Sequence, residues 1–120
     1  MGCIHIYTGH NVKNLKTALG MALRACGAGF NVGFCSFGES DAGINDLESR
    51  LPGFRILDCT GQDLSQLDMI ILHDCELAGC DKLQKLLSGI PKKTEIVLCG
   101  TAFSDDVLEM ADLVSEIVTL

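Results

Sequence analysis

The sequence has no Cys-x-x-Cys pair, no basic leader and no long apolar run. Its seven cysteines are odd in number and lack the paired spacing of a disulfide scaffold, which favours reduced thiols in a cytoplasmic protein. Residues 1–7 lack the basic and apolar regions of a signal peptide, so none is expected. No apolar stretch reaches the roughly 18–20 residues that cross a bilayer, so no membrane partner is expected.

Basic residues are also scarce. Nine Lys and Arg stand against sixteen Asp and Glu, a formal charge of −7, which makes nucleic acid an unfavourable partner. Apolar residues make up 48% of the chain, too many for a disordered acidic tail. The length of 120 residues predicts a single compact domain over residues 1–120.

Short apolar runs alternate with stretches whose apolar residues recur at helical spacing. The runs predict strands at residues 3–7, 31–37, 54–58, 69–72, 95–99 and 113–118. The helical patterns cover residues 13–26, 44–51 and 82–88, and a further helix follows Ser104, an N-cap before two acids. This alternation predicts an α/β fold of three layers, with a mostly parallel sheet of five or six strands and helices on both faces.

Ligands of such sheets bind beyond the carboxyl ends of the strands, which directs attention to the connection after the first strand. It reads Thr8-Gly9-His10-Asn11-Val12-Lys13-Asn14-Leu15-Lys16-Thr17, and its first four residues predict a turn. A phosphate loop needs glycines, a lysine and a hydroxyl at fixed spacing. The Lys16-Thr17 pair falls one residue late, counted from Gly9, and there is no second glycine. An ordinary strand-turn-helix connection is an equal alternative.

Several segments, in order, carry a resemblance to one family. They are Ile4-His5-Ile6-Tyr7-Thr8-Gly9, Leu19-Gly20-Met21-Ala22-Leu23-Arg24-Ala25-Cys26-Gly27-Ala28-Gly29, Asn31-Val32-Gly33, Leu67-Asp68-Met69-Ile70-Ile71-Leu72, Glu95-Ile96-Val97-Leu98-Cys99-Gly100 and Ala111-Asp112-Leu113-Val114-Ser115-Glu116-Ile117. Together these segments resemble the ATP:corrinoid adenosyltransferases of the P-loop type. The resemblance implies a P-loop-NTPase-like sheet and transfer of the 5′-deoxyadenosyl group of ATP to a cob(I)alamin-type corrinoid. It also implies ATP and Mg²⁺ as cofactors, and a nucleotide or corrinoid as the small-molecule partner.

The departures from the family fall on its chemistry. The family's loop runs Thr-Gly-x-Gly-Lys-Gly-Lys-Thr-Thr, and in ungapped register only Thr8 and Gly9 match it. The implied nucleotide site is therefore degenerate, and it comprises Thr8, Gly9, His10, Asn11, Lys13, Asn14 and Lys16. The family's acidic pair becomes His73-Asp74, and its Thr-Gly-Arg becomes Cys99-Gly100-Thr101. Because a phosphate-facing charge or an oxygen ligand for Mg²⁺ is lost at each place, we expect adenosyl transfer to be weak or lost.

Two alternatives stay open. One is a non-catalytic binding or regulatory module on the same fold, which leaves the question of an enzyme undecided and assigns no catalytic residue. The other is a thiol or metal site at His73, Cys75 and Cys80, which follow the most apolar predicted strand. The competing interpretation of these cysteines is ordinary core packing, and we assign no metal ligand. Compared with the family, the middle of the chain is short, and the apolar surface that this exposes would favour a homodimer.

Overall fold

The computed structural model describes residues 3–9, 11–38, 42–58 and 64–118. Within this part, six strands form one sheet in which every neighbouring pair is parallel. The strands are β1 (Ile4–Gly9), β2 (Val32–Ser36), β3 (Phe54–Ile56), β4 (Met69–His73), β5 (Glu95–Gly100) and β6 (Leu113–Ile117). Their order across the sheet is β3-β2-β4-β5-β1-β6. The predicted α/β class with a parallel sheet is confirmed.

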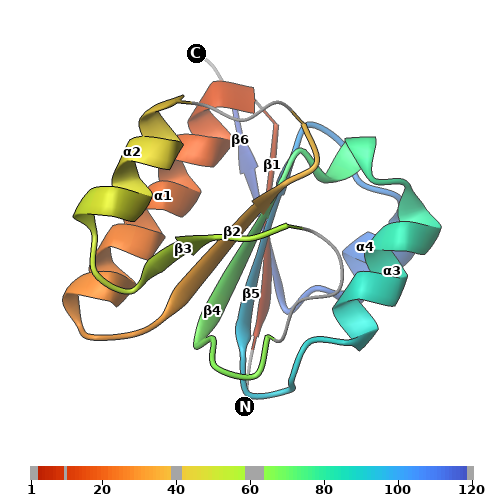
Figure 1. Cartoon of the computed structure of the whole chain (residues 1–120). Helices are drawn as coiled ribbons and strands as arrows, with labels where there is room; N and C mark the ends of the chain where they lie inside the picture. Colours follow the sequence, from red (N-terminus) through yellow and green to blue (C-terminus); the bar gives the residue numbers. More distant parts are fainter. Residues whose placement is uncertain (1–2, 10, 39–41, 59–63, 119–120) are drawn as a thin grey trace.

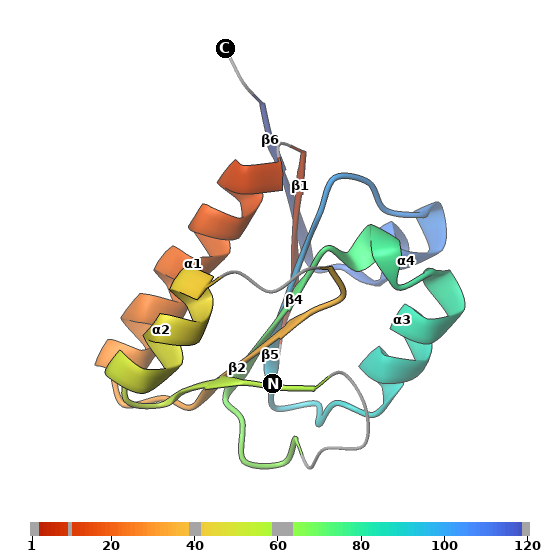
Figure 2. The same ribbon diagram turned by 45° about the horizontal axis from the view of Figure 1, so that its top comes forward.

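Helices cover both faces of this sheet (Figures 1 and 2). On one face lie α1 (Asn11–Gly27) and α2 (Ala42–Arg50), and on the other lie α3 (Cys80–Ser88) and α4 (Asp105–Met110). The chain steps toward the β3 edge from β1 to β3, then back toward the β6 edge. Right-handed crossovers place the helices of these two directions on opposite faces, which accounts for the three layers.

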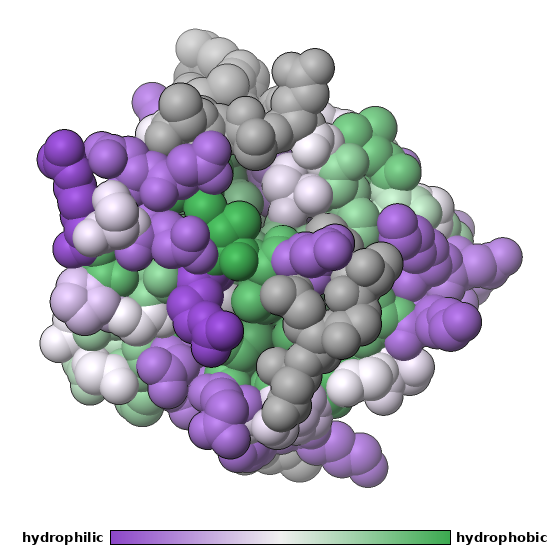
Figure 3. All heavy atoms as spheres, in the orientation of Figure 1, coloured by the Kyte–Doolittle hydropathy of each residue, from purple (hydrophilic) through white to green (hydrophobic). Residues whose placement is uncertain are grey.

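The two central strands are buried on both faces, and each supplies two hydrophobic cores by alternation. Ile71 of β4 and Val97 of β5 belong to the core beneath α1 and α2. Ile70 and Leu98, their neighbours along the strands, belong to the core beneath α3 and α4. This double burial explains why both strands read as unbroken apolar runs. Figure 3 shows hydrophilic side chains over the outer helical surfaces and hydrophobic surface between the two helical layers.

The ends of the elements follow local chemistry where a cap is present. Ser104 caps α4, since its Oγ accepts the N–H of Val107 at 3.4 Å, as the sequence predicted. A short 3₁₀ turn, η1 (Cys75–Leu77), follows β4 and was not predicted. It begins after Asp74, whose backbone is left-handed at φ 56° and ψ 44°. Left-handed backbone is uncommon for a residue with a side chain, and it turns the chain sharply at the end of β4.

Candidate functional site

At two places in the sheet, neighbouring strands are followed by helices on opposite faces, and we call each of these places a reversal. β1 leads into α1 on one face, while its neighbour β5 leads into α4 on the other; β2 and β4 form the same kind of pair, with α2 and α3. Such reversals open the crevice in which ligands of parallel sheets bind. Three predicted positions, Thr8-Gly9, His73-Asp74 and Gly100-Thr101, lie at the carboxyl ends of strands that finish at this edge. The topology therefore gathers the predicted site residues at one edge.

The connection from β1 to α1 differs from the predicted turn. β1 runs through Gly9 and α1 begins at Asn11, so Asn11, Lys13, Asn14 and Lys16 all lie in the first two turns of the helix. His10, also a predicted site residue, lies outside the described residues. A phosphate loop needs a stretch of non-helical backbone between strand and helix, and here only position 10 separates the two.

The presence of glycine at position 9 is explained by the structure. Its φ of +116° is a conformation that residues with a Cβ rarely adopt, and it pairs with Ile117 of β6. A Cβ at this position would lie 2.2 Å from the main-chain oxygen of Ile117. The close approach of the β6 backbone therefore requires glycine here, whether or not any phosphate binds.

A carboxylate lies across the reversal between β1 and β5. Glu76 of η1 accepts the N–H of Thr101 through Oε1 at 3.1 Å, and the carbonyl of Thr101 accepts the hydroxyl of Thr8 at 3.3 Å. A Cβ on Gly100 would lie 2.6 Å from the same Glu76 oxygen. The N–H of Thr101, directly after β5, is thus occupied by a negative side chain of the chain itself.

The acidic-pair position is a buried histidine beside a strained aspartate. His73 is 8% exposed, its Nδ1 lies 3.1 Å from Oγ of Ser36, and its ring stacks on Phe34 at 6.0 Å between centroids. Its Nε2 is 3.3 Å from Oδ1 of Asp74, an ion-pair distance, but the angles do not make a hydrogen bond. A hydrogen bond needs alignment as well as distance, so the Nε2 of His73 has no hydrogen-bond partner among the described residues. The bond between His73 and Ser36 joins the end of β4 to the end of β2.

The thiols near this edge are core residues in their contacts. Cys75 is 2% exposed, and its Sγ donates to the carbonyl of Leu72 at 3.2 Å. Burial raises the pKa of Cys75 above its ordinary value and that of Cys99 to about 12, so both stay protonated at neutral pH. No three His, Cys, Asp or Glu residues of the described chain lie close enough to hold a metal ion, and the Cys80 thiol instead faces Ser104 at 3.4 Å.

One expectation about the cysteines is wrong. Cys35, at 1% exposure in β2, is disulfide-bonded, whereas the sequence favoured reduced thiols throughout. Cysteine spacing along the chain could not indicate this, because pairing depends on Cα atoms brought together by the fold. Cys3, Cys26, Cys75, Cys80 and Cys99 are free thiols.

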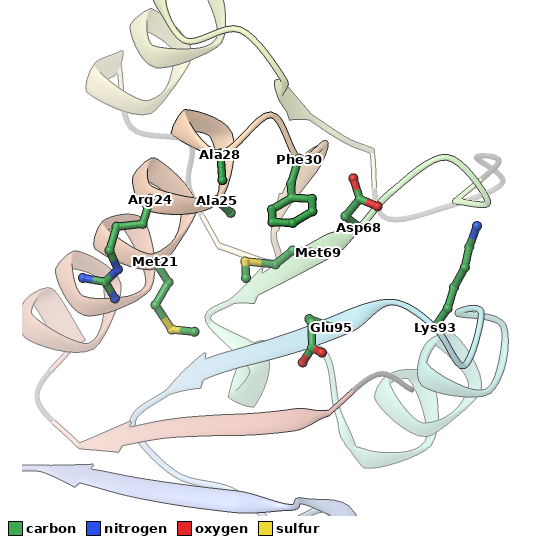
Figure 4. Close-up of a pocket in the computed structure, with 9 residues that line it drawn as sticks. All are labelled: Met21, Arg24, Ala25, Ala28, Phe30, Asp68, Met69, Lys93 and Glu95. Atoms are coloured by element: carbon green, nitrogen blue, oxygen red, sulfur yellow. The ribbon is translucent and has the colours of Figure 1, made fainter.

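A cavity of about 510 Å³ lies at the amino ends of the strands, where β4 and β5 begin. Its wall is largely apolar and comes from the last turns of α1, the chain after it and the first residue of β4: Met21, Ala25, Ala28, Phe30 and Met69. Figure 4 shows the Phe30 ring and the two methionine side chains lying between α1 and the strand starts, with Arg24 at one end and Lys93 at the other. The Phe30 ring is 50% exposed.

The four charged residues of this cavity fall into two kinds. Asp68 accepts the N–H of Asn31 at 2.8 Å and Glu95 accepts that of Cys3 at 3.0 Å, so both acids are held by the backbone. Arg24 and Lys93 form no ion pair within the described part of the chain. The cations are therefore the groups left to meet a ligand. Sequence reasoning missed this cavity because its lining comes from three separate segments that share no motif.

Comparison of the chain with protein families and with curated proteins finds no match. Among the described residues, the helices are too short or too polar to cross a membrane.

Proposed function

We propose that this chain is a non-catalytic small-molecule-binding domain on an adenosyltransferase-like scaffold, and that its ligand occupies the cavity lined by Met21, Phe30 and Met69. The observation that carries the proposal is the cavity itself, whose volume of about 510 Å³ lies within the range of small-molecule sites. A mostly apolar wall with few charged groups at its ends is typical of such sites.

The carboxyl edge supports a loss of Mg·ATP chemistry. An ATP phosphate at the reversal between β1 and β5 would meet the Glu76 carboxylate, which already holds the N–H of Thr101. Mg²⁺ prefers oxygen ligands, whereas the acidic-pair position offers an imidazole and a carboxylate that face each other. These residues do not fit Mg·ATP, so we derive no catalytic step through it.

The cavity also indicates the class of ligand. The exposed face of Phe30 and the thioethers of Met21 and Met69 suit a flat aromatic or other apolar body. Because the two acids are bound to backbone N–H groups, Arg24 and Lys93 favour an anionic substituent on that body. The proposed ligand is therefore an aromatic or aliphatic anion of small size.

The test uses 8-anilinonaphthalene-1-sulfonate, an aromatic anion whose fluorescence rises in apolar sites. We expect saturable binding to the native chain, and at least about tenfold weaker binding to Ala28→Trp, whose exposed position lets the indole fill the mouth of the cavity. The matched control is Leu23→Trp, because Leu23 is 57% exposed on α1 and does not line the cavity. Equal binding by both variants would show that the dye binds elsewhere, and the proposed site would be wrong.

A second candidate, adenosyl transfer itself, is favoured by one observation: the end of β1, where the resemblance places the phosphate site, lies beside β5 at a reversal of strand order. Calorimetry with ATP and Mg²⁺ separates the two candidates. We expect no heat of binding and no thermal shift. A dissociation constant below about 100 μM, or about −5.5 kcal/mol, would favour the enzyme, whatever the dye experiment shows.

A further inference from the structure

The sheet has two edges, and the chain closes one of them. At the β3 edge the outward-facing N–H groups are those of Phe54 and Ile56, since the N–H of Leu57 is bonded to β2. The Phe54 N–H donates to the carbonyl of Leu51, and the Ile56 N–H donates to the carboxylate of Glu48 on α2. This edge, only three residues long, has no outward donor left for another strand.

The β6 edge is built differently. The N–H of Asp112 donates to the carbonyl of Ile4 at 2.8 Å, so it points toward β1. Successive N–H groups of a strand alternate in direction, which turns those of Leu113 and Ser115 away from the sheet. Within the described chain β6 pairs with β1 alone, and no strand lies beyond it. A five-residue strand therefore presents an open row of backbone donors and acceptors.

Several aliphatic side chains along this edge are exposed. Leu113, Val114 and Val118 are 54%, 44% and 60% exposed, and Met110 of the preceding helix is 39% exposed. Proteins commonly protect such an edge with lysine, proline or a bulge, and the segment from Leu113 to Val118 contains no lysine or proline. An exposed aliphatic strand without these protections is suited to pairing with another chain.

The charge around this edge is of one sign. After Lys93 the sequence contains no Lys or Arg, whereas α4 and the chain through β6 carry five exposed acids, of which Asp112 accepts the N–H of Ile4 at 2.8 Å: Asp105, Asp106, Glu109, Asp112 and Glu116. A second copy of this chain would bring the same acids to the edge, and like charges across a strand pair are destabilising. A partner with basic side chains would be complementary instead.

We propose that the open β6 edge binds an extended segment of a partner protein in which aliphatic residues alternate with Lys or Arg. The segment adds a seventh strand to the sheet by bonding to the main chain of Leu113 and Ser115. Its aliphatic side chains lie on the face of Leu113, and its basic side chains lie on the opposite face, which carries Glu116 and α4. This proposal is independent of the ligand proposed for the cavity.

The probe is a terminally blocked peptide of alternating valine and lysine, about seven residues long to match a strand. Two control peptides separate the contribution of charge from that of main-chain hydrogen bonding. One replaces each lysine by glutamate, and the other carries N-methyl groups on alternate amides and cannot form strand hydrogen bonds. By fluorescence anisotropy, we expect the valine–lysine peptide to bind at least about tenfold more tightly than either control. Hydrogen exchange of the Leu113 and Ser115 amides should slow when it binds.

A variant of the protein tests the same edge. Ser115→Pro removes an outward N–H that no strand of the described chain accepts, and proline is tolerated at such edge positions. We expect it to weaken peptide binding by about tenfold, while Ser115→Ala, which removes only the hydroxyl bonded to His5, binds normally. Should Ser115→Pro fail to fold, the N-methylated peptide and the exchange data on the native chain still decide.

Three results would overturn the proposal. Equal affinity for the valine–glutamate peptide would contradict a basic partner. Unchanged hydrogen exchange of the Leu113 and Ser115 amides would contradict the addition of a strand. The third is a native dimer by light scattering that Ser115→Pro dissociates, because this would make a second copy the occupant of the edge.

Discussion

Alanine at Gly9 and alanine at Gly20 should change the stability of the protein in opposite directions. One glycine ends β1 and the other lies within α1, and their surroundings differ. Gly9 has φ +116° and the main chain of Ile117 against it, whereas a Cβ on Gly20, inside α1, would have nothing within 4 Å. The same chemical change therefore tests whether Gly9 serves the β6 contact.

The expected magnitudes follow from these contacts. A residue forced into a sparsely populated backbone region costs about 1–3 kcal/mol, and at Gly9 a backbone clash at 2.2 Å adds to this, giving about 3 kcal/mol or more. At Gly20, alanine should stabilise the helix by about 0.8–1 kcal/mol. With an unfolding entropy of about 2.1 cal/mol/K per residue over 120 residues, the melting temperature should fall by about 12 °C for Gly9→Ala and rise by about 4 °C for Gly20→Ala.

Thermal and urea denaturation followed by circular dichroism measure both variants. If Gly9→Ala melts within about 2 °C of the native chain, a shift of well under 1 kcal/mol, then β6 does not pack over Gly9 and the reasoning fails. A phosphate-binding role for Gly9 would then have to be considered again. Gly20→Ala is the control, because it shows whether any glycine-to-alanine substitution near α1 destabilises the protein.

Three further predictions concern single side chains. Burial lowers the pKa of His5 below its ordinary 6.5, so the unfolded state takes up the proton first; stability should fall as the pH drops below about 6.5, and urea denaturation should show a smaller fall for His5→Gln. A thiol reagent at about pH 8 should modify Cys80 well before Cys75, because burial keeps Cys75 protonated and out of reach; peptide mass spectrometry reads the order, and a faster Cys75 would contradict the packing. Ser104→Ala should cost about 1 kcal/mol through loss of the α4 cap, and Ser104→Asp should retain the stability in the same denaturation assay.

Much of the fold could be predicted because its strands are buried on both faces. Residues 69–72 and 96–99 read as continuous apolar runs, and both lie in central strands. Ser104 gave the start of α4 because a side-chain cap is a local interaction. The end of β1 was harder to predict from the sequence. Gly9 and Thr8 read as a turn, but pairing with the distant β6 holds them in the strand.

The candidate sites divide in the same way. The carboxyl edge was predicted from topology, since any parallel sheet ends its strands there. The bond from Thr101 to Glu76 was not, because it joins η1 to the end of β5 across 25 positions of sequence. The cavity near Phe30 has no local pattern at all: its floor, rim and charges come from elements that meet only after folding.

The position of β1 has a consequence for how the chain is made. Its two partners are β5 and β6, and the N–H of Cys3 meets the Glu95 side chain 92 positions away. On a translating ribosome β1 would thus wait, with Ile4 and Ile6 uncovered, until β5 and β6 had been synthesised. Pairing of such widely separated segments is slow, and the nascent chain should depend on chaperones until β6 leaves the exit tunnel.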